Sequence, residues 1–196
     1  MTVKRIVGVG VLGAVSAALV AVAVTAWVGV LAGEQPAESA NQAASATSAS
    51  PPVRYAPPTV GVADGVNVDQ AEVSAFVDRV VQDPRGWRTD LDQFTVRLVQ
   101  AGNEGTQRMP GLIGYANPGQ RTAAISDEAW TVLGPRFAAT GGTLDDQRAW
   151  VVLHELGHLL GRPHQECPGA GPAPVMRETN YDLRGCGFNV WPNPAG

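Results

Sequence analysis

The chain has 196 residues, of which 44% are hydrophobic and 16% are charged, and its net charge at pH 7 is −4. Residues 1–33 contain two basic and no acidic residues, so the 12 basic and 18 acidic residues of the remaining chain give it a net charge of −6. This acidic balance excludes nucleic acid as the expected partner. Residues 59–196 show no internal repeat and have the length of one folded domain.

The N-terminal segment has the composition of a membrane anchor. Lys4 and Arg5 precede an uncharged and mostly apolar run from Ile6 to Gly33. This run exceeds both the roughly 20 residues that span a bilayer and the about 7 to 15 residues of a signal-peptide core. We therefore predict a single-pass signal-anchor in residues 1–33, with a cytoplasmic N-terminus and with the rest of the chain on the extracytoplasmic side. The alternative is a signal peptide cleaved near residues 30–32, which would release a secreted protein.

The segment that follows contains little that could form a hydrophobic core. Residues 34–58 are dominated by Ala, Ser, Pro, Gln and Glu, without a periodic apolar pattern. Such segments do not bury enough apolar surface to offset the entropy lost on folding. We predict a disordered stalk here, and a folded domain in residues 59–196.

The folded domain is predicted to mix strands and helices. Asp69 is expected to cap a helix that reaches about Val81, because apolar residues recur on one helical face. A helix is also predicted to begin between Thr143 and Asp146, whose acidic side chains favour a helix N-terminus. Asp64-Gly65 is predicted to form a turn, to which we assign no calcium. Strands are predicted at Thr59 to Ala63, Phe94 to Val99, Leu112 to Ala116 and Arg121 to Ser126.

All three histidines of the chain lie in one window of eleven residues, in the pattern H-E-x-x-H-x-x-G-x-x-H. His154 and His158 are four residues apart, so on a helix both imidazoles project from one face and can reach one cation. Gly161 can adopt the positive φ that ends a helix and turns the chain. His164 then follows from outside the helix as a third ligand. We predict a metal site with these three ligands.

Three neutral imidazoles leave one coordination position of a zinc ion open, which is typical of catalytic rather than structural zinc sites. Zinc in such a site lowers the pKa of a coordinated water to roughly 7. Glu155 follows the first ligand and is the candidate catalytic residue, acting as a general base on that water. The alternative for H-E-x-x-H alone is a pair of surface histidines on an amphipathic helix. The additional glycine and third histidine favour the metal site.

These residues, together with Met176, resemble the metzincin clan of zinc metallopeptidases. The resemblance implies a zincin fold of the α/β (α+β) class, with a twisted mixed sheet, a backing helix, a zinc-binding active-site helix and a small irregular C-terminal subdomain. It also implies that Met176, in the turn Pro174-Val175-Met176, forms a hydrophobic floor beneath the metal. More narrowly, residues 59–196 are similar to actinobacterial envelope-associated metzincin-like proteins of unassigned function.

The sequence departs from the clan in identifiable places. Some metzincins have a tyrosine ligand two residues after the turn methionine, but Glu178 occupies this position, and we do not assign the out-of-register Tyr181 to zinc.

In the clan, an edge strand above the zinc pairs with an extended substrate. Residues 112–116 and 121–126 are both candidates for this edge strand.

Cys167 and Cys186 are the only cysteines. In a chain delivered outside the membrane they are predicted to form a disulfide, and the alternative is that one of them is a thiolate zinc ligand. The closed loop would contain Met176 and begin three residues after His164. Reduction is therefore expected to loosen the metal site more than the sheet.

Three aromatic or polar side chains near the motif are assigned less specific roles. Trp130 and Trp150 are interpreted as core residues rather than as walls of a cleft. Gln165 is either a local hydrogen-bonding residue or a surface residue.

Together these patterns predict an extracytoplasmic, membrane-anchored, zinc-dependent metalloendopeptidase, with Zn2+ as its cofactor and a peptide or protein as its substrate. One alternative retains the chemistry but takes the peptide portion of the cell wall as substrate. A second alternative is a zinc-containing binding module without turnover. Glu155 argues against the binding module, because metal binding alone needs no general base.

Overall fold

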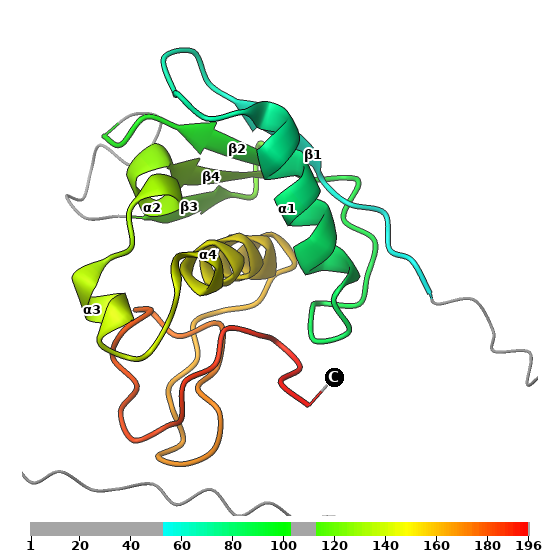
Figure 1. The fold of residues 1–196 in the computed structure, drawn as a ribbon. Helices are drawn as coiled ribbons and strands as arrows, with labels where there is room; N and C mark the ends of the chain where they lie inside the picture. Colours follow the sequence, from blue (N-terminus) through cyan, green and yellow to red (C-terminus); the bar gives the residue numbers. More distant parts are fainter. Residues whose placement is uncertain (1–52, 103–112, 196) are drawn as a thin grey trace, which may run out of the picture. The chain divides into compact units, whose positions relative to one another are not determined.

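The computed structural model describes residues 53–102 and 113–195, and these residues form a mixed α/β structure (Figure 1). The predicted mixed α/β fold class is confirmed at this level. The elements in chain order are β1 (Thr59–Val62), α1 (Gln70–Gln82), β2 (Thr95–Val99), β3 (Gly114–Asn117), β4 (Thr122–Ser126), α2 (Asp127–Thr131), α3 (Pro135–Ala138) and α4 (Leu144–Leu159).

The four strands form one mixed sheet in the order β1-β2-β4-β3. The pairs β1/β2 and β2/β4 are parallel, whereas β3 and β4 form an antiparallel hairpin. The short turn of this hairpin is stabilised by Asn117, whose side-chain oxygen accepts from the N–H of Gln120 at 3.1 Å. Because β4 is paired on both sides, β3 and not β4 lies at an edge of the sheet, and none of the described strands pairs with its outer side. This pairing distinguishes the two strands that the sequence left as equal candidates.

Helix α1 forms where the sequence predicts it. The side chain of Asp69 accepts from the backbone N–H groups of Ala71 at 2.6 Å and Glu72 at 3.3 Å, and so caps the helix N-terminus. Five apolar side chains on one face of the helix are buried, namely those of Val73, Phe76, Val77, Val80 and Val81. Full burial of such a side chain stabilises the fold by roughly 1.5–3 kcal/mol, so this face and not helix propensity holds α1 in place.

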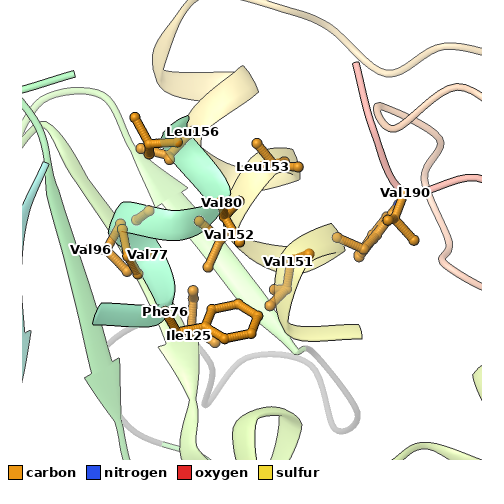
Figure 2. Close-up of a cluster of buried hydrophobic side chains, with 14 of the residues drawn as sticks. Phe76, Val77, Val80, Val96, Ile125, Val151, Val152, Leu153, Leu156 and Val190 are labelled. Atoms are coloured by element: carbon orange, nitrogen blue, oxygen red, sulfur yellow. The ribbon is translucent and has the colours of Figure 1, made fainter. Parts of the chain in front are cut away.

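Helix α4 shares its core with α1 and the sheet. It contacts β3, β4 and α1, while α1 also contacts β1. Figure 2 shows side chains of α1 and α4 meeting those of the strands, with Val152 and Leu153 near Val80. Every residue from Ala149 to Gly157 is buried, so the middle of this helix is covered on all sides. The two metal-site histidines of α4 are therefore carried by a rigid element.

Two short helices were not predicted. Helix α2 begins directly after β4, where the Ser126 side chain accepts from the N–H of Ala129 at 3.1 Å. Helix α3 begins at Pro135, a residue that suits the first helical position. With five and four residues respectively, they are too short to produce a helical periodicity in the sequence. The predicted turn at Asp64-Gly65 is confirmed, with φ of 81° at Gly65.

The segment after α4 contains no helix and no regular strand between residues 160 and 195, all of which are described. Its chain is held by an isolated bridge between Pro172 and Gly187 and by the disulfide between Cys167 and Cys186. In Figure 1 this segment, drawn in orange and red, lies beside α4 on the side away from the sheet. The arrangement agrees with a small irregular C-terminal part.

The prediction of a single-pass membrane protein is wrong for the described part of the chain. Among residues 53–102 and 113–195, no helix is long and apolar enough to cross a bilayer. The 16 residues of α4 rise about 24 Å, less than the ~30 Å of a bilayer core. The segment for which the anchor was predicted, residues 1–33, lies outside the described residues, as does most of the predicted stalk.

Candidate metal centre

The end of α4 brings the third histidine back toward the first two. The helix closes with two hydrogen bonds, from the N–H of Gly161 to the oxygen of His158 and from the N–H of Arg162 to the oxygen of Gly157, both at 2.9 Å. This pairing is a Schellman motif, which requires a left-handed residue just past the helix. Gly161 supplies it with φ of 77°, as predicted. The chain then reverses and returns to the helix end at His164.

The three predicted ligands meet at one point. The Nε2 atom of His158 lies 3.1 Å from Nε2 of His154 and 3.1 Å from Nε2 of His164. One ligand atom from each residue lies within 4.8 Å of the others. His154 is buried, His158 is partly buried and His164 is exposed, so the cluster is open to solvent on one side. The three histidines are thus close enough to bind one metal ion.

The hydrogen bonds of two rings determine their protonation. Nδ1 of His154 lies 3.0 Å from the carbonyl oxygen of Val175, and Nδ1 of His158 lies 2.9 Å from that of Arg162. Because a carbonyl oxygen only accepts, each Nδ1 must carry the ring proton, and each Nε2 of a neutral ring then presents a lone pair. Two lone pairs facing each other at 3.1 Å repel unless a cation lies between them. The donor set therefore fits a metal ion.

The environment keeps the buried ring neutral. The pKa of His154 is lowered to about 3, mainly by burial and in smaller part by the neighbouring His158, His164 and Arg177, while the hydrogen bond to Val175 opposes this shift. Burial also lowers the pKa of His158. At neutral pH both rings are therefore unprotonated and able to coordinate a cation without first losing a proton.

Glu155 is directed from α4 toward strand β3. It is only 5% exposed. Its pKa is raised to about 8, mainly because burial disfavours the charged form, while the backbone of Ala116 acts in the opposite direction. A nearby divalent cation favours the charged carboxylate, so metal binding at the histidines would shift this pKa downward.

Met176 packs against α4 at Gly157, which lies between His154 and His158 in the helix sequence. It is 1% exposed and packs against Gly157, where a Cβ atom would collide with its sulfur. The turn that carries Met176 also contacts the ligands on both sides. Its Val175 oxygen accepts from His154, and the Met176 oxygen accepts from the N–H of Gln165 at 2.9 Å. Gln165 itself is exposed, which agrees with a surface residue, and only its backbone N–H takes part in this contact.

The disulfide prediction is confirmed. Cys167 and Cys186 are bonded, with 6.0 Å between their Cα atoms. The bridge closes the loop that contains Met176, and it begins three residues after His164. A thiolate ligand to the metal from either cysteine is thereby excluded in this structure.

Two tryptophans predicted as core residues are buried, with Trp130 at 3% and Trp150 at 2% exposure. Trp150 additionally stacks on the ring of His154, with centroids 4.4 Å apart. The hydroxyl group of Tyr181, which was not assigned to the metal, accepts from Arg136 at 3.0 Å. The burial of Trp130 and Trp150 agrees with their interpretation as core residues.

Sequence reasoning missed two residues that support the site. Trp87 donates from Nε1 to the oxygen of Leu153 in α4 at 2.8 Å and packs against Gly157. Arg177 is 4% exposed and donates to the carbonyl oxygens of three residues, Pro174, Asn180 and Asn189, at 3.1, 2.9 and 3.1 Å. Its place next to Met176 was the one signal in the sequence that could have drawn attention to it.

No family model, curated protein or solved structure matches this chain. The metzincin resemblance therefore stays a prediction based on the residues of the histidine motif and Met176.

Proposed function

We propose that this chain is a zinc-dependent metallopeptidase of metzincin type. In this proposal His154, His158 and His164 hold the zinc ion, and Glu155 is the catalytic residue. One observation carries the proposal: the Nε2 atoms of the three histidines converge, with that of His158 3.1 Å from each of the other two, and the residue after the first ligand has a buried carboxyl group.

Zinc is the metal that this donor set suits best. Zinc–nitrogen bonds of about 2.0–2.1 Å in tetrahedral geometry place two nitrogen ligands roughly 3.3 Å apart. The nitrogen separations of 3.1 Å are close to this value. The Nδ1–H groups of His154 and His158 are held by carbonyl oxygens, which is the usual orientation of metal-binding histidines. When bound, zinc supplies a Lewis acid that polarises a carbonyl group and acidifies water.

Glu155 handles the protons of the reaction. As a carboxylate it takes a proton from the attacking water, whose oxygen then bonds to the carbonyl carbon of the substrate. The same side chain returns the proton to the amide nitrogen as the C–N bond breaks. Its burial beside β3 restricts the carboxyl group to few positions and favours proton transfer over exchange with bulk water.

The substrate is proposed to be a peptide in extended form. Strand β3 is an edge strand that contacts α4, and its outer side pairs with no strand in the described part of the chain. Such edges bind extended peptides through main-chain hydrogen bonds. A binding module without turnover would need no buried carboxyl group next to a ligand. The position of Glu155 therefore favours hydrolysis over binding alone.

Cleavage of a diverse library of unstructured peptides tests this proposal. We expect the oxidised, zinc-loaded full chain to cleave peptides, and Glu155→Ala to keep zinc but lose at least about 10³-fold in rate. Glu178→Ala is the matched control, because Glu178 is exposed and is expected to be dispensable for turnover. Equal turnover by the parent and Glu155→Ala would contradict the proposal, as would zinc binding without cleavage of any peptide.

A further inference from the structure

Gly114 lies in strand β3 directly against the carboxyl group of Glu155. A Cβ atom at Gly114 would lie 2.7 Å from Oε1 and 2.9 Å from Cγ of Glu155, and 2.8 Å from Cγ2 of Val151. Real Cβ atoms essentially never approach other heavy atoms this closely, so any side chain at residue 114 would displace its neighbours. The absence of a side chain here creates the space that the carboxyl group fills.

Glu155 has little freedom to avoid such a contact. It is 5% exposed and belongs to the buried middle of α4, where Val151 lies one turn earlier. The helix itself is fixed by packing on both the sheet and α1. A methyl group at residue 114 would therefore move the carboxyl group and not the helix or the strand.

The backbone N–H and C=O groups of Gly114 point to the side of β3 that pairs with no described strand. The N–H of Ser126 in β4 donates to the oxygen of Ile113 at 3.0 Å. In an antiparallel pair such bonds alternate along the strand, so Ile113 and Tyr115 direct their peptide groups toward β4. Gly114 and Ala116 consequently direct theirs toward the free edge, where an extended peptide would add.

We propose that Gly114 is a positioning residue for Glu155. Strand β3, at the edge of the described sheet, would then both pair with a peptide and fix the carboxyl group of Glu155. The catalytic role that we infer from this contact rests on the proposed function, whereas the close approach of Gly114 to Glu155 is independent of that function. The inference extends the site from α4 to a residue 41 positions earlier in the sequence.

The first test is a double-mutant cycle on the thermal stability of the zinc-loaded full chain. We expect Gly114→Ala to lower Tm by about 5 °C in the parent and by clearly less in the Glu155→Ala background, where the crowded atoms are gone. Gly61→Ala is the matched control, because Gly61 lies in β1 with no heavy atom within 4 Å of a Cβ atom. Equal losses in both backgrounds would overturn the proposal, including the case in which both Gly114→Ala proteins fail to fold.

The second test separates positioning from simple packing. Gly114→Ala is expected to keep one zinc ion and to lose about 10²-fold in kcat, with a smaller change in KM. Adding Val151→Ala removes the other crowded contact and should not recover turnover, because the contact with Glu155 remains. Undiminished kcat in a folded Gly114→Ala protein would overturn the positioning role while leaving the metallopeptidase proposal intact. Absence of turnover in the parent would contradict the metallopeptidase proposal, and the stability cycle would still decide whether residue 114 holds Glu155.

Discussion

The Nδ1 atom of His154 lies 3.0 Å from the carbonyl oxygen of Val175, the residue that immediately precedes Met176. This one contact joins the first predicted ligand to the turn that carries the buried methionine. It fixes which ring nitrogen bears the proton, and so leaves Nε2 free to coordinate. The irregular C-terminal segment thereby acts on the metal site through both packing and ligand orientation.

Removal of the Met176 side chain should weaken both the fold and the metal site. Met176→Ala leaves a cavity beneath Gly157 and is expected to lower the free energy of unfolding by about 2–5 kcal/mol. Because the adjacent Val175 holds His154, zinc affinity should fall as well. Chemical denaturation and zinc titration measure the two effects. Met176→Leu is the control and should cost less than about 1.5 kcal/mol, because it conserves volume. Unchanged zinc affinity in Met176→Ala would contradict the supporting role of this turn.

The stability of the metal-free chain should depend on the charge of Glu155. Its pKa in the folded protein is raised to about 8 from 4.5, so the folded state holds a proton that the unfolded state releases. The stabilisation linked to this proton is complete below about pH 4.5 and is lost as pH rises toward 8. Glu155→Gln, which stays neutral, should remove this loss, and its advantage over the parent should grow by about 2–4 kcal/mol between pH 5 and pH 9. Urea denaturation at several pH values checks this, and a constant difference would refute it.

Reduction of the disulfide should affect the metal site before the sheet. The bridge closes a loop of about 20 residues, worth roughly 3 kcal/mol, and the loop contains Met176. The sheet and α1 lie outside this loop. We expect the Cys167→Ser/Cys186→Ser variant to release zinc more readily than the parent while its far-ultraviolet circular dichroism changes little. Parallel loss of zinc and of secondary structure would show that the bridge supports the whole fold.

The histidine cluster could be predicted from sequence because its geometry is local. The spacing of His154 and His158 on a helix and the left-handed turn at Gly161 bring the three histidines together, and only the orientation of the His154 ring depends on the distant Val175. The capped helix α1 was predictable for the same reason. In each case the residues that determine the local structure lie in the same short segment as the structure they form.

What could not be predicted depends on contacts between distant segments. The sequence offered two strands as the free edge, and the choice of β3 follows only from the pairing of β4 with β2. The contact of Gly114 with Glu155 depends on how α4 packs on the sheet. Arg177 was overlooked because arginine is rarely buried, and its burial depends on three carbonyl groups of a loop without regular structure.

The most direct test of the central claim is zinc-edge X-ray absorption on the oxidised full chain loaded with one equivalent of zinc. Three histidine ligands and one open position predict three nitrogen scatterers and one further nitrogen or oxygen scatterer, all at about 2.0–2.1 Å. His164→Ala should bind more weakly and show one imidazole fewer. A sulfur scatterer at about 2.3 Å, or a spectrum unchanged by His164→Ala, would contradict the three-histidine centre.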